Sequence, residues 1–149
     1  MNCQNNLRRN GSTEVKVEVL RWENPPETSS VWSADVLLAA DVIYDAAAAE
    51  AFAKLVAQLL KRNAKVLYMS LEKRVYFSSA TLKAEVAAYP QFLEDCAALG
   101  LAVEQIDLST VPVHFSYVRS RFYELVQITK KGDLNPLKRK LPETGEAEI

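Results

Sequence analysis

Asp41, Tyr44 and Asp45 are the residues of this sequence whose types and placement best suit chemistry or binding. They follow a short apolar run, residues 36–40, and precede a long amphipathic segment. An apolar run before such a segment is typical of a strand that is buried on both faces of a parallel sheet. Open α/β sheets bind their ligands just beyond the carboxyl ends of the strands. The sequence therefore predicts that these three side chains lie where a ligand would bind.

Length, net charge and the content of cysteine and histidine limit the classes of protein to which the chain can belong. A chain of 149 residues allows one domain with a hydrophobic core. Its net charge of -1 gives no overall field that would favour nucleic acid or a membrane as a direct partner. Cys3 and Cys96 are too few for a disulfide framework, which favours a reducing compartment, the nucleus or the cytoplasm. His114 is the only histidine and has no cysteine nearby, so we expect no metal site.

Hydrophobic periodicity predicts the elements that must position these residues. We expect helices at 2–9, 46–62 and 79–99, the last kinked or split by Pro90, and strands at 15–20, 34–40, 65–71, 101–107 and 121–129. No helical pattern separates the last two strands, so the final strand should be antiparallel. Residues 131–149 are rich in charge and contain Pro and Gly, which predicts a disordered tail after a domain at 1–130.

The order of these elements resembles that of the seven-stranded, S-adenosylmethionine-dependent methyltransferases. Leu20-Arg21-Trp22 follows one strand, and Asp41-Val42-Ile43-Tyr44 follows the next. Asp-x-x-Tyr after the fourth strand is the mark of the protein-lysine methyltransferase branch, often called family 16. Ser70-Leu71-Glu72-Lys73-Arg74 adds to the match, and the resemblance covers residues 2 to about 130.

The resemblance implies transfer of a methyl group from S-adenosylmethionine to a lysine of a protein substrate. Asp41 would capture and orient that lysine, because a carboxylate stabilises the ammonium form and does not ease its deprotonation. The ring of Tyr44 would wall the channel. Trp22 would lie against the adenine and the small Ala40 would border the cofactor. Glu72 and its two basic neighbours would line the substrate mouth.

Structural roles are the alternative for each of these residues. Asp41 would then cap the helix that begins near Ala46, and Tyr44 would pack against its neighbours. Trp22 would be a half-buried residue at a strand end. The Glu72 segment would be a solvated turn.

Part of the family's pattern has no counterpart in the sequence. The family holds its cofactor with a glycine-rich loop after strand one and an acidic residue after strand two. The only glycines are Gly11, Gly100, Gly132 and Gly145, and they form no Gly-x-Gly. In the family's sheet order, 3-2-1-4-5-7-6, strands four, five, seven and six would remain contiguous. We therefore expect an α/β fold, the C-terminal part of a Rossmann-like methyltransferase sheet with strands one and two absent and the last strand antiparallel.

Such a chain is expected to bind S-adenosylmethionine weakly or not at all, and to be inactive alone. Two other functions stay open, a non-catalytic half-domain that binds a protein partner and a fragment of a dinucleotide-binding domain. The antiparallel final pair and the lack of Gly-x-Gly count against the second. The apolar edge of the strand at 34–40 is also expected to promote self-association.

Overall fold

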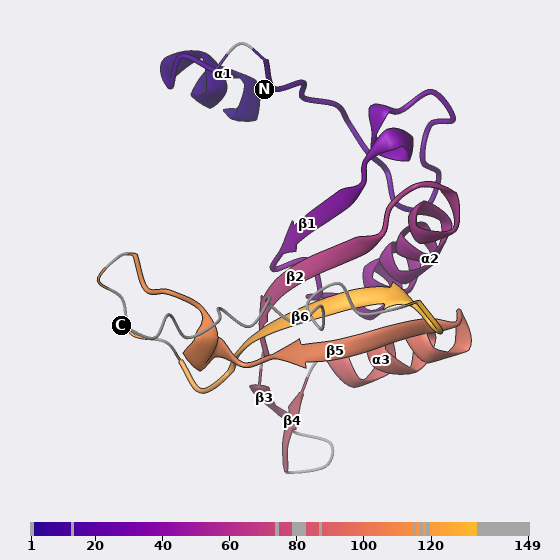
Figure 1. Cartoon of the computed structure of the whole chain (residues 1–149). Coiled ribbons are helices and arrows are strands. Elements are labelled where there is room, and N and C mark those ends of the chain that lie inside the picture. The colour runs from indigo at the N-terminus through magenta and orange to yellow at the C-terminus, as the bar shows by residue number, and fades with distance from the viewer. Residues whose placement is uncertain are drawn as a thin grey trace, which may run out of the picture.

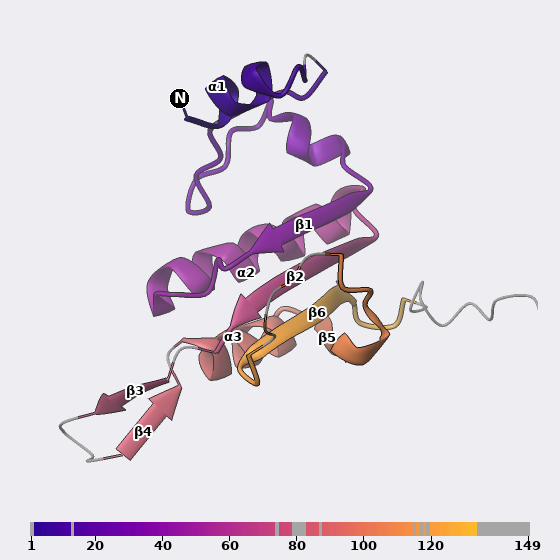
Figure 2. The ribbon, with the colours of Figure 1, turned by 90° about the vertical axis from the view of Figure 1, so that its left-hand side faces the viewer.

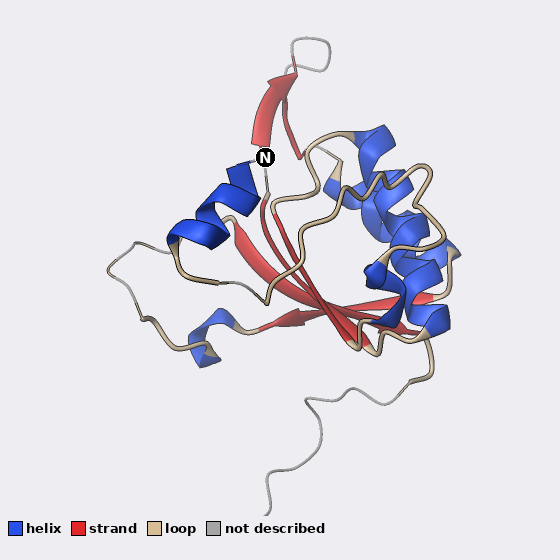
Figure 3. Cartoon of the chain, turned by 90° about the horizontal axis from the view of Figure 1, so that it is seen from above, coloured by secondary structure: helices blue, strands red, loops and turns tan. Residues whose placement is uncertain are grey.

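A computed structural model describes residues 2–12, 14–73, 75–78, 83–86, 88–114, 116, 118 and 120–133. The described part is built around a four-stranded sheet with two long helices on one of its faces (Figures 1 and 3). The predicted disordered tail begins at residue 131, and from residue 134 onward it lies outside the described residues. The division into a domain and a tail therefore stays a prediction.

The helices and strands have the following bounds. The helices are α1 (Asn2–Arg9), α2 (Ala46–Arg62) and α3 (Tyr89–Ala98), with short 3-10 turns η1 (Ser30–Ser33) and η2 (Leu108–Thr110). The strands are β1 (Val36–Ala40), β2 (Val66–Glu72), β3 (Val75–Ser78), β4 (Lys83–Val86), β5 (Leu101–Ile106) and β6 (Tyr123–Lys130).

The sheet has the strand order β1-β2-β6-β5, and its topology confirms the predicted α/β class. β1 and β2 are parallel and are joined through α2, as a crossover between parallel strands requires. β6 runs antiparallel to both of its neighbours, β2 and β5. The predicted antiparallel final strand is thus confirmed, and so is the contiguous order of the last four strands.

The β1–α2 junction shows why the helix begins where it does. Asp45 has an extended backbone, and its Oδ1 accepts a hydrogen bond of 2.9 Å from the Ala48 N–H. An aspartate at this position satisfies one of the unpaired amides of the first helical turn. The capping residue is therefore Asp45, and the structural alternative that gave this role to Asp41 is wrong. The helix then lays an apolar stripe on the sheet, formed by Phe52, Leu55, Val56, Leu59 and Leu60.

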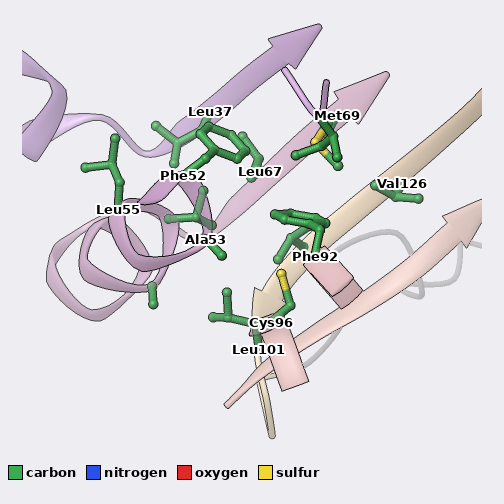
Figure 4. Packing of buried hydrophobic residues seen from close by; sticks show 14 of the residues in the cluster. Leu37, Phe52, Ala53, Leu55, Leu67, Met69, Phe92, Cys96, Leu101 and Val126 are labelled. Carbon is green, nitrogen blue, oxygen red and sulfur yellow. The ribbon is translucent and has the colours of Figure 1, made fainter. Parts of the chain in front are cut away.

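The core lies between the helices and one face of the sheet (Figure 4). Alternate residues of β2 and β6 point into it, because successive side chains of a strand face opposite sides. Met69 and Ile128 are fully buried there, and Phe92 and Cys96 of α3 meet them with no exposed surface. Burial raises the pKa of the Cys96 thiol to about 12.

β1 is the edge strand of the described sheet and pairs only with β2. Leu37 faces the core and is 9% exposed, whereas Leu38 on the opposite face is 81% exposed. A strand edge with unpaired amides and carbonyls is a template for further pairing. Figure 2 shows that α1 lies apart from the helices that cover the sheet, and none of its residues is buried.

One predicted element is wrong, and another is wrong in part. Residues 15–20 form no strand, although Val15, Val17 and Val19 alternate with polar residues as a strand would. Glu18 instead accepts hydrogen bonds from Ser29 and Ser30 and pairs with Lys16. Alternation alone does not make a strand, because the ladder needs a partner.

The predicted helix at 79–99 is wrong in its first part, where β4 pairs with β3 in a hairpin. Its second part is confirmed as α3. β3 and β4 pair antiparallel, and the helix begins only at Tyr89. Pro90 lies in the first helical turn, where its missing N–H has no partner to lose. The proline therefore marks the start of α3 and does not kink a longer helix. Residues 79–82 and 87 lie outside the described residues.

Candidate functional site

A cavity of about 470 Å³ opens at the carboxyl ends of β1 and β2. β6 runs the opposite way, so its first residues reach the same edge of the sheet, and the chain after β5 enters η2 beside them. Three strands of the sheet, β1, β2 and β6, and the chain that follows β5 therefore contribute to one site. Its lining residues are Ala40, Asp41, Ser70, Leu71, Glu72, Leu108, Val111, Tyr123, Glu124 and Leu125.

Asp41 stands at the point where the chain leaves β1. Its N–H donates a hydrogen bond of 2.8 Å to the Ser70 carbonyl, which extends the ladder of β1 and β2 by one residue. Its φ is +52°, a left-handed conformation that aspartate tolerates better than most residues but that still costs free energy. Such strained positions concentrate at binding and catalytic sites. The strain thus fits a position that lines a functional cavity.

The structure brings only two of the four predicted site residues to the cavity. Ala40 and Asp41 line it. Tyr44 is 54% exposed and does not line it. The ring of Trp22 packs instead against Phe52, with 5.0 Å between ring centroids, on the partly buried margin of the core.

Asp41, Glu72 and Glu124 are the carboxylates that line the cavity, and Glu124 is held by partners within the chain. Glu124 forms an ion pair with Lys73 and accepts a hydrogen bond of 3.5 Å from Gln105 Nε2. Burial raises the pKa of Tyr89, and its hydrogen bond to Glu124 raises it further. Lys73 Nζ also lies 5.9 Å from the centroid of the Tyr89 ring. Glu72, by contrast, pairs with no cation among the described residues.

The remaining cavity residues were missed by sequence reasoning. Leu108 and Val111 lie in the connection between β5 and β6, and Tyr123 and Leu125 lie at the start of β6. The available signal was the predicted antiparallel final strand, since its start must lie beside the ends of the parallel strands. Of the predicted basic neighbours of Glu72, Lys73 turns to Glu124, and Arg74 lies outside the described residues.

Removing the charge of Glu124 should destabilise the contacts that join the cavity to the core. Glu124→Gln is expected to lower the free energy of unfolding by about 1–2 kcal/mol, because Lys73 and Tyr89 lose a charged partner that is largely shielded from water. Glu50→Gln is the matched control, since Glu50 and Lys54 form an exposed i,i+4 pair that solvent screens and that contributes little to stability. Urea denaturation of both variants measures the difference. Equal losses in the two variants would contradict the role given to Glu124.

The described residues hold no group of three or more His, Cys, Asp or Glu side chains that would suit a metal ion. His114 lies exposed in the loop after η2. Within the described ranges, no helix is both long and apolar enough to cross a membrane.

Comparison with known proteins identifies the family. A family model described as lysine methyltransferase matches residues 1–86. The match spans 86 of the 149 residues and includes β1, Asp41 and the whole of β2, and therefore half of the cavity. No curated protein sequence matches the chain significantly. The extent of the family match, and the place of the cavity within it, show that this chain belongs to the lysine methyltransferase family.

Proposed function

We propose that this chain is the lysine-binding part of a protein-lysine N-methyltransferase, whose complete form transfers a methyl group from S-adenosylmethionine to a lysine of a protein substrate. The cavity at the ends of β1 and β2 carries this proposal, because it combines aliphatic walls with Asp41 and Glu72. A lysine side chain is a flexible four-carbon stem that ends in a compact cation. Leu108, Val111 and Leu125 match the stem, and the carboxylates match the charge.

The carboxylates would hold the lysine in place. A nearby negative charge stabilises the ammonium form, so Asp41 and Glu72 would raise the pKa of the bound lysine and not ease its deprotonation. Their contribution would be capture and orientation, and correct orientation of the reacting groups supplies a large part of many rate enhancements. The left-handed backbone conformation of Asp41 sets the direction in which its side chain leaves the main chain. Loss of the lysine proton must then depend on something other than these two residues.

The family uses S-adenosylmethionine, and two observations count against a cradle for it among the described residues. The sequence has no Gly-x-Gly, and Trp22 packs on Phe52 away from the cavity lining. Of the two residues expected at the cofactor, only Ala40 lines the cavity. We therefore propose that the cofactor-binding elements of the complete enzyme are not part of this sequence, and that this chain alone is inactive.

Within the family, we propose that the chain is most similar to methyltransferase-like protein 22. The support is the segment Ser70-Leu71-Glu72-Lys73-Arg74, followed by Phe77, Ala88-Tyr89 and Phe92. The proposed location is the nucleus or the cytoplasm, since only two cysteines occur and Cys96 is buried as a free thiol.

A non-catalytic half-domain that binds a protein partner is the second candidate function. The exposed apolar edge favours it, because Val36 is 53% exposed and Leu38 is 81% exposed on a strand with a free side. The same edge supports the proposal that the chain self-associates. A binding half-domain would use β1, whereas a lysine-binding domain would use the cavity, so the location of bound ligand discriminates between them.

The test of the proposed function is a nuclear magnetic resonance titration with butylammonium chloride, the side chain of lysine in isolation. Amide shifts are expected at Asp41, Glu72 and Leu125, and 1-butanol at the same concentration should cause much smaller shifts because it lacks the charge. Asp41→Asn, which keeps the shape and tolerates the same backbone, should weaken binding about 3- to 5-fold. Asp35→Asn is the control, since Asp35 pairs with Lys65 at the other end of β1. Equal shifts from the amine and the alcohol would refute a lysine site.

A further inference from the structure

We infer that Tyr123, and not Tyr44, is the aromatic wall that contacts the substrate lysine; this inference rests on the proposed function. Tyr123 lines the cavity, and Tyr44 does not. The ring of Tyr123 comes from β6, the strand that also contributes Glu124 and Leu125 to the lining. A residue far away in the sequence thereby takes the position that the motif next to β1 suggests for Tyr44.

The strand register places Tyr123 opposite a carboxylate. Tyr123 pairs with Glu72 across the β2–β6 ladder, and Leu125 pairs with Ser70. Directly opposed residues share a face of the sheet, and their Cβ atoms typically lie about 4.5–5.5 Å apart. Tyr123 and Glu72 therefore stand side by side on the cavity wall. A cation that enters between them meets a negative charge on one side and the π-system of an aromatic ring on the other.

The backbone around Tyr123 is anchored. Its N–H donates a hydrogen bond of 3.1 Å to the Ser120 carbonyl, and Lys73 N–H donates one of 2.9 Å to the Phe122 carbonyl. The first bond closes the turn before Tyr123, and the second ties the start of β6 to the end of β2. Tyr123 remains 38% exposed, so part of its surface is open at the cavity. A fixed, half-open ring is what an aromatic contact to an incoming side chain requires.

The ring would attract methylated lysine in a way that the carboxylates do not. Each methyl group added to a lysine ammonium removes one N–H donor. The positive charge is kept at every stage and is permanent in the fully methylated form. Hydrogen bonding to Asp41 or Glu72 therefore weakens with methylation, whereas attraction to the ring face persists, as in aromatic cages for methylated lysine. Tyr123 would let the cavity hold the lysine at every stage of methylation. Tyr123 would thus set the range of methylation states that the cavity accepts.

The test compares butylammonium chloride with butyltrimethylammonium chloride, which has no N–H to donate, in the titration of the full chain. Tyr123→Leu should weaken butyltrimethylammonium binding about 3- to 5-fold, and Tyr123→Phe should retain it because the ring is kept. The N-methyl protons of the bound probe should shift upfield through the ring current of Tyr123. This shift should persist in Tyr123→Phe and vanish in Tyr123→Leu. Tyr44→Leu is the matched control and should change neither affinity nor shift.

The outcomes separate this inference from the proposed function. Binding of butylammonium that depends on Asp41 but not on Tyr123 would overturn the aromatic wall alone. A loss caused by Tyr44→Leu would return the role to Tyr44. Failure of the unaltered chain to bind either amine would overturn both proposals. If Tyr123→Leu loses its folded spectrum, the upfield shift in the unaltered chain and in Tyr123→Phe still decides, because no leucine variant is needed to see it.

Discussion

Phe92→Ala is expected to lower the free energy of unfolding by about 3–5 kcal/mol, a large part of the stability of a small domain. Phe92 has no exposed surface and joins α3 to the sheet. Its ring stacks on Tyr89 and Phe52, with centroid distances of 6.5 Å and 6.2 Å. Removing it would leave a cavity that the surrounding helices and sheet can fill only in part. Urea or thermal denaturation measures the loss.

Leu38→Ala is the matched control for Phe92→Ala. It also shortens a large apolar side chain, but Leu38 is 81% exposed on the edge strand. Substitutions at such surface positions usually stay within about 0.5 kcal/mol. A loss from Leu38→Ala as large as that from Phe92→Ala would mean that β1 is covered in solution, and that the core described here is incomplete.

S-adenosylmethionine is expected to bind this chain at least about 100-fold more weakly than it binds an intact member of the family. The reason is that no Gly-x-Gly is present and that Trp22 is held against Phe52. A 100-fold loss corresponds to about 2.7 kcal/mol, which the absence of a few hydrogen bonds to a cofactor readily accounts for. Titration calorimetry of both proteins in one buffer measures the ratio. A dissociation constant in the low micromolar range for this chain would show that its residues do form a cofactor site.

The elements with strong local signals could be predicted from the sequence. The apolar runs of β1 and β2 and the stripe of α2 define their own periods, and all three elements lie where the periodicity places them. The segment at 15–20 has an equally regular alternation, but its strand state depends on a partner that local sequence does not specify. The hairpin of β3 and β4 could not be predicted, because the spacing of apolar residues in this region also fits a helix. Pro90 suits either a kink or a first turn, and only the fold decides between them.

The residues of the candidate site also fall into two groups, those that local sequence predicts and those that only strand pairing brings to the cavity. Ala40 and Asp41 could be predicted because they end a buried strand, which is a property of the local sequence. Tyr123 lies 82 positions after Asp41 and reaches the cavity only through the pairing of β6 with β2. Tyr44 shares a motif with Asp41, but the chain changes direction at the left-handed Asp41 and begins α2 with the cap formed by Asp45. Tyr44 lies between these two points and does not line the cavity. Local sequence fixes where a strand ends, and tertiary pairing determines which side chains meet there.

The most direct test of the central claim is to locate a bound amine by isotope-filtered nuclear Overhauser spectroscopy. Labelled chain is mixed with unlabelled butylammonium chloride, and contacts between the two are recorded. A lysine site at the ends of β1 and β2 predicts cross-peaks from the butyl methylenes to the methyl groups of Val111 and Leu125. Cross-peaks confined to Val36 and Leu38 on the exposed edge of β1, or none at all, would contradict it.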